Sequence, residues 1–484
     1  MITGRMASPA EPDSPAPDRL TRILEAGLIG VVLLAPLPFG AVTARGRLAL
    51  ELAAYALALL WIVGAAIRGM TLPSRAVRIG LAGLLTLGIV QAVPLHRAIV
   101  GPVSPRAVEV RQSSLPSGEV LEIENRLLGQ ESRALQPTPS LSLEPERTAS
   151  ALRTGAALAV LLLIAVSVAR DAGAGRLTAA LLVSAAFQSL YGILVLASGH
   201  DMIWNVPKIH YVDSATGTFI NKNHFAGFVA AALPCGLALI LHRARRRRGP
   251  RPGRLRDHLV DQLSPEGIRS LLLGLLLVVG IAGLLLSLSR AGTALGIAAL
   301  AATVVTAGRK GLRTRLVVAT LVVAVAAVPL AQIGADRLSD RFARSKDDLL
   351  SGHRAVVWSD TSSMALDFPV VGTGFGTFSA VYPLYRSPEV RLFFDHAHND
   401  LLQALAEGGV IGIFFLGMIL LPVGRRIVGA FAGAGGTLAV GIAAGLMALL
   451  LHELIDFNLH IPSNAALAAI LAGTLLGLSW NPRT

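Results

Sequence analysis

Apolar runs that are long enough to cross a lipid bilayer recur along almost the whole of this 484-residue chain. A helix needs about 20 apolar residues to span the hydrocarbon core. Only 15% of the residues are charged, against about a quarter in soluble proteins. We therefore expect an all-α polytopic membrane protein with about twelve transmembrane helices. The predicted spans are 23–42, 48–67, 78–96, 151–169, 177–198, 220–241, 270–289, 292–308, 315–333, 401–422, 434–452 and 463–480.

The net charge of +13 is distributed in a way that sets the orientation of these spans. Many basic residues lie in short connections between apolar runs, and the densest group is HRARRRRGPRPGRLR at 242–256. Short loops rich in Lys and Arg stay in the cytoplasm, so we expect these loops and both termini there. The same distribution argues against nucleic-acid binding. Residues 1–20, rich in Pro, Ser and Asp, are predicted to be a disordered cytoplasmic tail, and Cys235, the only cysteine, to be a packing residue.

Three longer segments then face the outer side of the membrane, at about 97–150, 199–219 and 334–400. Loops longer than about 15 residues are usually functional or disordered. The last segment contains many aromatic and apolar residues, so we expect it to fold partly into short helices at the membrane surface. The chain is divided into an N-terminal transmembrane region, 21–210, and a second transmembrane region, 211–480.

The stretch FDHAHNDLLQALAEGG, residues 394–409, places many polar groups directly before an apolar run. Polar groups near hydrocarbon are costly and usually functional. If the helix begins near Asp395, then Asn399, Gln403 and Glu407 share one face because they are spaced four residues apart. His396 and His398 stand at its outer end. Asp395 acting as a cap, with a few polar contacts between helices, is the plainer alternative, but a cap does not explain two imidazoles.

Other polar groups are predicted to reach the same outer surface. They are Asn221, Lys222, Asn223 and His224 before the sixth span, Ser287, Ser289 and Arg290 after the seventh, and His452, Asp456 and His460 after the eleventh. Lys222 or Arg290 alone could be snorkelling to the interface. Snorkelling does not account for four separate segments that deliver cations, imidazoles and carboxamides to one side.

This combination of groups suits an anionic substrate at the membrane surface, above all a lipid-linked diphosphate. Arg290 is a permanently charged donor for phosphate oxygens, Lys222 a second cation, and Arg354 a third, although Arg354 also fits a plain contact with headgroups. A nearby histidine can accept a proton from an attacking hydroxyl near neutral pH. The pattern favours glycosyl transfer, with the glycines of VVGTGFGTF (370–378) either shaping turns near substrate or serving as ordinary loop glycines.

Two metal sites are alternatives to this interpretation. HAH with Asp400 could bind zinc, but no third ligand set is evident. HELID at 452–456 begins like the H-E-x-x-H motif of metalloproteases, yet Asp456 stands where the second histidine is needed. We therefore predict no metal and no cofactor. A polysaccharide or lipid transporter is the alternative from another class, but it predicts charges near the bilayer midplane and an internal repeat.

The sequence resembles the bacterial O-antigen ligase and Wzy polymerase superfamily over about residues 215–465. The ligase signature of His, then Asn, nine residues and Gly-x-x-Gly is met by His398, Asn399, Gly409 and Gly412. GTFINKNHFAG, LSLSRAG and RAVVWSDTSSMALDFPVVGTGFGTF also resemble the family in order and placement.

The resemblance implies a metal-independent, inverting glycosyltransferase with a GT-C-like fold in the bacterial inner membrane. Its donor would be a glycan on undecaprenyl diphosphate at the periplasmic face, and its acceptor the lipid A core, a growing glycan or a protein. The catalytic histidine of the family corresponds to His398 and its diphosphate-binding arginine to Arg290. A second cation corresponds to Lys222, a weaker match because it is lysine. Local geometry and spacing add a list of supporting residues: His396, Asn399, Gln403, Glu407 and Asp456.

Overall fold

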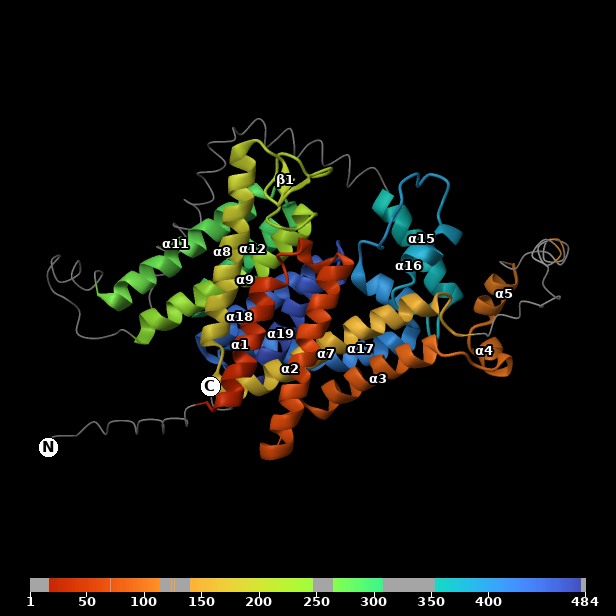
Figure 1. Ribbon diagram of the computed structural model, residues 1–484, viewed down its shortest axis with the longest axis horizontal. Coiled ribbons are helices and arrows are strands. Elements are labelled where there is room, and N and C mark those ends of the chain that lie inside the picture. Colours follow the sequence, from red (N-terminus) through yellow and green to blue (C-terminus); the bar gives the residue numbers. More distant parts are fainter. Residues whose placement is uncertain are drawn as a thin grey trace.

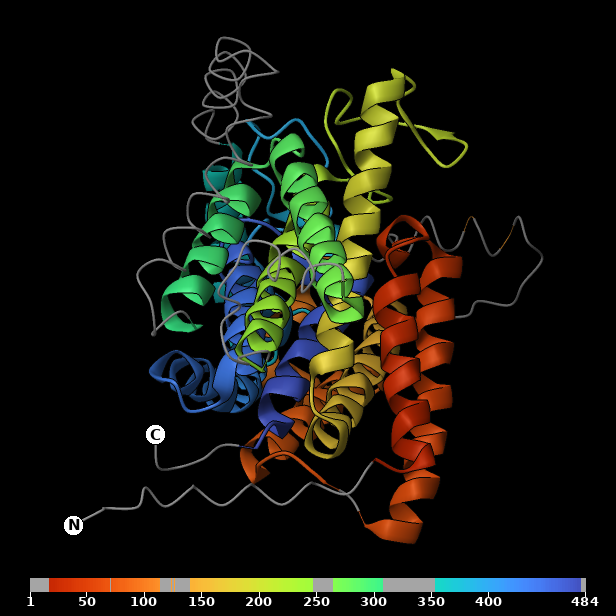
Figure 2. The same ribbon diagram turned by 90° about the vertical axis from the view of Figure 1, so that its left-hand side faces the viewer.

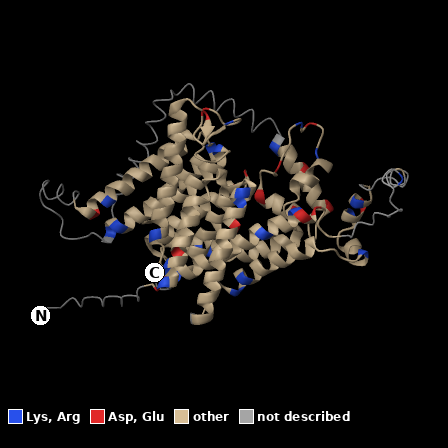
Figure 3. Cartoon of the chain, in the orientation of Figure 1, with Lys and Arg blue, Asp and Glu red and all other residues tan. Residues whose placement is uncertain are grey.

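The computed structural model describes residues 17–69, 71–113, 123, 126, 140–246, 264–307 and 353–479. The predicted span 315–333 and residues 247–256 of the basic cluster lie outside these ranges. Within them, eight helices are long and apolar enough to cross a membrane, and two shorter apolar helices accompany them. The chain is therefore a helical, multi-pass membrane protein. Figure 3 shows long helical stretches without charged residues, as this class requires.

The helices that correspond to predicted spans follow those spans closely, with two exceptions (Figure 1). These helices are α1 (Arg19–Leu34), α2 (Ala44–Arg68), α3 (Arg75–Ala92), α7 (Pro145–Ala172), α8 (Gly175–Ser198), α9 (Lys222–Arg246), α11 (Pro265–Leu286), α12 (Arg290–Ala307), α17 (Asp400–Ala432), α18 (Gly436–His452) and α19 (Pro462–Gly477). The exceptions are that α1 ends eight residues earlier and α17 ten residues later than predicted. Several start at a side chain that accepts the free N–H groups of the first turn, such as Thr43 before α2 and Ser264 before α11.

The three longer connections contain structure of their own. Helices α4 (Arg97–Val103) and α5 (Pro105–Ser113) follow α3, and a hairpin of β1 (Met202–Ile203) and β2 (Val206–Pro207) follows α8. Helices α15 (His353–Asp367) and α16 (Phe378–Val381) precede α17, with 3-10 turns at Tyr382–Leu384, Asn458–His460 and Phe39–Ala41. Short helices in the segment before α17 agree with the sequence prediction for it.

Helix α9 lies at the centre of the bundle, where 89% of its most apolar stretch is buried, against 22% for α11. Cys235 of α9 is fully buried, as expected of a packing residue. Small residues bring α18 against α9. A Cβ at Gly445 would collide with the carbonyl oxygen of Ala231, and a Cβ at Gly441 would lie 2.5 Å from that of Pro234. Close backbone approach at glycines is the usual way in which membrane helices pack.

The helices place their ends at two sides of the bundle (Figure 2). Asp18, before α1, and Ser167, near the end of α7, line one cavity, and a Cβ at Gly477, at the end of α19, would collide with the Val166 carbonyl oxygen. At the other side, Gly40 after α1 contacts Phe219 before α9 and Ile461 before α19. The starts of α9, α12, α17 and α19 and the end of α18 share this second side, which we call the histidine end.

Helix α17 begins at Asp400, one residue before the predicted span 401–422, so the alternative in which it begins near Asp395 is wrong. Asn399 is its N-cap, and its side-chain oxygen accepts the N–H of Leu402 at 3.0 Å. The N–H of Asp400 donates to the carbonyl oxygen of Glu453 at 3.0 Å. This contact with the end of α18 selects Asn399 over Asp395 as the cap. Gln403 and Glu407 still share a face, since Gln403 Nε2 lies 3.1 Å from Glu407 Oε1.

Helix α17 is interrupted at Gly409, which has a φ of +61°. The segment 369–377 fills the break. The N–H of Val410 donates to the Pro369 carbonyl oxygen at 2.8 Å, and the N–H of Gly374 donates to that of Glu407 at 3.0 Å. A Cβ at Gly409 would collide with the Val370 carbonyl oxygen. Glycine is thus required here because two backbones touch. Of the glycines of VVGTGFGTF, Gly372 packs against α17, whereas Gly374 and Gly376 face Ser142 and the start of α7.

Gln91 of α3 closes the same interruption and is fully buried. Its Nε2 donates to the carbonyl oxygens of Val371 at 2.6 Å and Glu407 at 2.9 Å, and its Oε1 accepts the N–H of Phe375 at 3.2 Å. Backbone groups left free by a broken helix must find partners when they are away from water. Gln91 makes three such hydrogen bonds, so it holds α3, α17 and the segment 369–377 together.

Candidate functional site

The centre of the histidine end is the carboxylate of Asp456, which is 2% exposed. Asn223 Nδ2 donates to its Oδ2 at 2.9 Å. Its Oδ1 lies 3.5 Å from His398 Nδ1 and 3.7 Å from His224 Nε2. Three elements therefore meet at one buried carboxylate: the start of α9, the turn before α17 and the turn after α18. A buried carboxylate of this kind needs such partners to remain ionised.

His398 is held in an uncommon backbone conformation, with a φ of +54°. A residue other than glycine in this region costs about 1–3 kcal/mol and is found mainly at functional sites. The indole N–H of Trp358 in α15 donates to the carbonyl oxygen of Ala397 at 3.0 Å, which fixes the preceding peptide. The His398 side chain is 20% exposed while its Nδ1 is buried toward Asp456. Its Nε2 is therefore the ring nitrogen that does not face Asp456.

The ring of Phe457 packs among three imidazoles. Its centroid lies 4.5 Å from that of His224, 4.6 Å from that of His396 and 4.7 Å from that of His398. Because Phe457 follows Asp456 directly, the turn after α18 supplies both the carboxylate and the apolar wall of the site. This wall limits the positions that the rings can adopt.

A second acid–imidazole pair lies beside the first. His460 Nδ1 lies 2.8 Å from Asp400 Oδ1, and the N–H of Leu459 donates to Asp400 Oδ2 at 3.2 Å and to Glu453 Oε2 at 3.1 Å. Burial, together with the nearby Asp400 carboxylate, raises the pKa of Glu453 to about 11, so this side chain is protonated. Asp400 is the member of this carboxyl pair that faces His460.

Gln403 joins the second pair to the rest of the site. Its Nε2 lies 3.0 Å from His460 Nε2 and 3.2 Å from His396 Nδ1, and its Oε1 accepts the N–H of Ala397 at 3.0 Å. Glu407, one turn on, accepts the N–H groups of Gly376 at 2.8 Å and Phe378 at 2.9 Å. Gln403 and Glu407 thus act as positioning residues that tie the histidines to the segment filling the α17 break.

Burial and neighbouring charges shift the pKa values of these groups in different directions. Burial, with the His460 charge, lowers the pKa of His396 to about 2, so His396 is a neutral imidazole. Burial would raise the pKa of Asp456, but His224 and His398 outweigh it and hold that pKa well below its usual value. Burial would lower the pKa of His460, but Asp400 raises it above its usual value. The pKa values of two neighbouring imidazoles, His396 and His460, are therefore shifted in opposite directions.

The structure places the three cations predicted from sequence at this same end. Lys222 directly precedes Asn223, and its Nζ lies 5.8 Å from the centroid of the Tyr211 ring. Arg354 of α15 donates to the carbonyl oxygen of Ile455, next to Asp456, at 2.9 Å. Arg290 is the first residue of α12, whose start lies against α9, since a Cβ at Gly292 would lie 2.5 Å from the Ala226 Cβ.

The zinc hypothesis for HAH requires three ligands that converge on one point. Within the described ranges, no three His, Cys, Asp or Glu side chains are arranged to hold a metal ion. Asp400, the third member of that motif, faces His460 instead.

Sequence reasoning missed the roles of several residues. Asp400 and Glu453 were not predicted as members of a carboxyl pair, and Phe457 and Gln91 were not singled out. Their partners lie far along the chain or depend on the α17 break, so no local pattern reveals them. The dense polar composition of 394–400 and 452–460 is the signal that could have pointed to Asp400 and Glu453.

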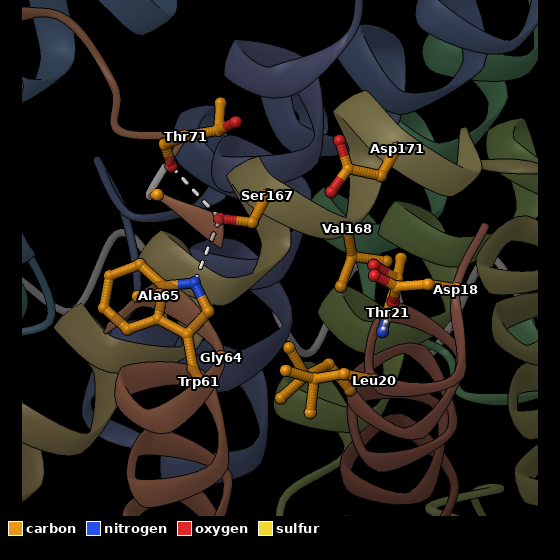
Figure 4. Close-up of a pocket in the computed structure, with 12 residues that line it drawn as sticks. Asp18, Leu20, Thr21, Trp61, Gly64, Ala65, Thr71, Ser167, Val168 and Asp171 are labelled. Atoms are coloured by element: carbon orange, nitrogen blue, oxygen red, sulfur yellow. Dashed lines mark hydrogen bonds between the residues drawn. The ribbon is translucent and has the colours of Figure 1, made fainter. Parts of the chain in front are cut away.

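A cavity of about 310 Å³ lies at the opposite end of the bundle (Figure 4). The Trp61 indole N–H donates to Ser167 Oγ at 3.0 Å, and Ser167 Oγ donates to the Thr71 carbonyl oxygen at 3.1 Å. Asp18 and Asp171 line the other side. This cavity contains no histidine and lies away from Asp456, so we do not assign the reaction to it.

Comparison with known families gives one match. Residues 275–417 match the Wzy_C family model, described as O-antigen ligase. This match, over residues 275–417, supports the resemblance to the O-antigen ligase and Wzy superfamily. Among curated proteins, none matches the chain.

The O-antigen ligase match covers only part of the site. It includes Arg290, Arg354, His398 and the broken helix α17 up to Gly417. Lys222 and Asp456 lie outside it, on α9 and on the turn after α18. The candidate site is therefore assembled from the matched region together with elements on both sides of it in the sequence.

Proposed function

We propose that this chain transfers a glycan from an undecaprenyl-diphosphate donor to an acceptor hydroxyl at the periplasmic face of the inner membrane. The observation that carries the proposal is the placement of His398. Its Nδ1 faces the buried Asp456 carboxylate at 3.5 Å, while its side chain remains partly exposed. An imidazole oriented by a carboxylate through one nitrogen can accept a proton at the other. The O-antigen ligase family supports the reaction class.

In the proposed step, the acceptor hydroxyl gives its proton to His398 Nε2. The hydroxyl oxygen forms a bond to the anomeric carbon of the donor as the bond from that carbon to the phosphate oxygen breaks. Attack opposite the leaving group inverts the anomeric configuration. Asp456 stabilises the imidazolium that forms, as a carboxylate does when it also orients the ring.

The departing diphosphate gains negative charge, and the histidine end offers positive charge to receive it. Lys222, Arg290 and Arg354 all lie there, and α9, α12, α17 and α19 all begin there. Helix starts carry partial positive charge and favour phosphate. Cations already in place stabilise a developing charge without reorganising. We propose Arg290 and Lys222 as the main diphosphate contacts and Arg354 as a third.

The basic loops support the orientation of the site. Arg170 and Arg176 lie at the end opposite Asp456, as does Arg426, which donates to the Leu478 carbonyl oxygen at 3.3 Å. Loops rich in such residues stay in the cytoplasm, so the histidine end would face the periplasm. A transporter would instead need polar groups along the whole path, whereas the imidazoles described above and the Asp456 carboxylate gather at one end.

The proposal is tested with His398→Ala and Arg290→Ala in cells. Both variants should insert at wild-type levels, and both should accumulate lipid-linked glycan while the finished polysaccharide disappears. Arg243→Ala, at the cytoplasmic end of α9, is the matched control because it removes one positive charge far from the histidine end. This control should leave the polysaccharide as in the wild type. Unchanged polysaccharide in both site variants would remove the proposal.

The acceptor is distinguished by a gel of wild-type and deletion membranes. A ligase deletion leaves long glycan that has lost its attachment to lipid A, whereas a polymerase deletion leaves only short units. Loss of a glycosylated protein band, with lipopolysaccharide unchanged, would identify a protein O-oligosaccharyltransferase. All three reactions have the same leaving group and would use the same residues.

A further inference from the structure

The connection between α8 and α9 turns apolar side chains outward and its lysine inward. Trp204 and Val206 are each 46% exposed, and Ile209 is 85% exposed. The Lys208 side chain is only 2% exposed, with its Nζ donating to the Ser214 carbonyl oxygen at 2.9 Å. A loop in water is expected to do the reverse. Polar side chains such as His210 are also exposed, and this mixture is typical of a membrane interface.

The hairpin is held firmly in this unusual arrangement. Trp204 and Tyr211 have φ angles of +56° and +57°, each a conformation that costs about 1–3 kcal/mol for a residue other than glycine. The Trp204 indole N–H donates to the Leu37 carbonyl oxygen at 2.9 Å, and its backbone N–H donates to the Tyr191 hydroxyl oxygen at 2.6 Å. The Trp204 and Tyr191 rings lie 4.9 Å apart. These contacts fix the side chains that point outward.

The same contacts set the depth of the hairpin. Tyr191 lies seven residues before the end of α8 at Ser198, which is about 10 Å along the helix axis. Helix α8 is about 36 Å long and exceeds the hydrocarbon thickness of about 30 Å. After leaving α8, the chain therefore returns toward the bilayer, beside the upper end of this helix (Figure 2).

Below the hairpin, α8 presents a stripe of exposed apolar side chains: Phe187, Leu190 and Leu194. Because α8 is a membrane-spanning helix, this stripe faces lipid, and the hairpin continues it. Trp and Tyr are enriched where membrane proteins meet headgroups. Continuity with a lipid-facing surface favours a bilayer over a protein partner as the occupant.

We propose that residues 202–212 insert into the boundary between headgroups and acyl chains, on the side of the membrane where the histidine end lies. Ile209, Val206 and Trp204 would enter the lipid while Lys208 stays covered. This membrane contact stands independently of the proposed function. One consequence rests on that function: Tyr211 lies against Lys222, so the hairpin would hold this cation at the depth of lipid phosphates.

The chain allows a clean test by site-directed spin labelling, because its single cysteine, Cys235, is fully buried. Ile209→Cys is labelled with a nitroxide in the full-length protein reconstituted into phosphatidylcholine and phosphatidylglycerol vesicles. Leu194→Cys is the lipid-facing control on α8, and Glu389→Cys is the exposed control in the segment before α17. Collision rates with oxygen, which concentrates in lipid, and with a water-soluble nickel chelate give the depth of each label.

If the hairpin enters lipid, the ratio of oxygen to nickel collisions at position 209 should approach that at 194 and exceed that at 389 several-fold. A ratio equal to that at 389 would place the hairpin in water and overturn the proposal. Low collision rates with both reagents would show that protein covers the hairpin, which would also overturn it. Val206→Cys is measured in parallel, and it replaces Ile209→Cys if that variant does not show the thermal unfolding of the wild type.

Discussion

At the end of the bundle opposite the histidines, the buried carboxylate of Glu25 lies 2.8 Å from the guanidinium of Arg176. At the histidine end, the buried carboxylate of Asp456 lies 3.5 and 3.7 Å from two imidazoles. Both arrangements satisfy a buried charge, but they differ in chemistry. Arginine keeps its proton at every ordinary pH, whereas histidine can accept or release one near neutrality. The first pair is suited to holding helices together, and the second to moving a proton.

The two ends also differ in how much of the backbone is regular. Helices α1 and α8, which carry Glu25 and Arg176, are uninterrupted. The histidine end combines a broken α17, a positive φ at His398 and turns that bring distant segments together. Strained backbone persists only where the surroundings determine it fully. We therefore expect changes that affect turnover to be confined to the histidine end, whereas changes at the opposite end should affect stability alone.

The largest difference between the ends is expected from Asp456→Asn. The amide keeps the shape of the side chain but cannot stabilise an imidazolium, so turnover should fall on the order of 10²-fold. The rate is measured with purified protein and lipid-linked donor, with the unfolding temperature of each sample as the check on folding. Turnover close to that of the wild type would show that His398 does not act through this carboxylate.

Gln91→Ala tests a residue at the histidine end that has a purely structural role. It leaves the Val371 carbonyl group and the Phe375 N–H without this partner, and it removes one of the two donors to the Glu407 carbonyl group. The free energy of unfolding should therefore fall by about 3 kcal/mol. Gln91→Glu is the matched variant, because it retains acceptors but loses the two donors. Thermal unfolding in the same detergent measures both. A stability within error of the wild type would mean that other groups close the α17 break.

The His460→Gln variant tests the second acid–imidazole pair through pH. The pKa of His460 is raised in the folded protein because Asp400 outweighs burial. A raised pKa contributes stability that is full below the unfolded value, near 6.5, and is lost as pH rises through the folded value. The loss of unfolding temperature caused by this substitution should be larger at about pH 6 than at about pH 9. An equal or reversed difference would contradict the pairing.

Glu25→Gln is expected to have the smallest effect. It weakens the pair with Arg176, which is largely exposed, so the unfolding temperature should fall slightly. Turnover should be unchanged, because this end supplies no group to the reaction. The same preparations and assay as for Asp456→Asn allow direct comparison. A loss of turnover as large as that of Asp456→Asn would remove the distinction between the two ends.

The sequence was sufficient to predict where the polar clusters lie. Asn223, His398 and Asp456 each stand at the boundary of an apolar run, and the alternation of spans brings such boundaries to one side of a membrane. That reasoning does not require knowledge of any side-chain contact. The same reasoning from span boundaries predicted that the cations Lys222 and Arg354 lie on the side of the membrane where these clusters lie.

The pairing within the cluster could not be predicted. Asp395 and Asn399 are both good helix caps, and a contact between Asp400 and Glu453, far apart in the chain, decides between them. Gln91 stands in an apolar helix with no local feature that marks it. Its role depends on the interruption at Gly409, which only tertiary structure shows.

The central claim is that His398 accepts the proton of the acceptor hydroxyl. It is tested most directly by measuring the release of isoprenyl diphosphate from a glycan-bearing donor, in proteoliposomes that contain wild-type protein or His398→Ala. We expect release in the variant to fall by at least about 10²-fold while the protein retains its wild-type unfolding temperature. Release at a rate within a few-fold of the wild type would contradict the claim.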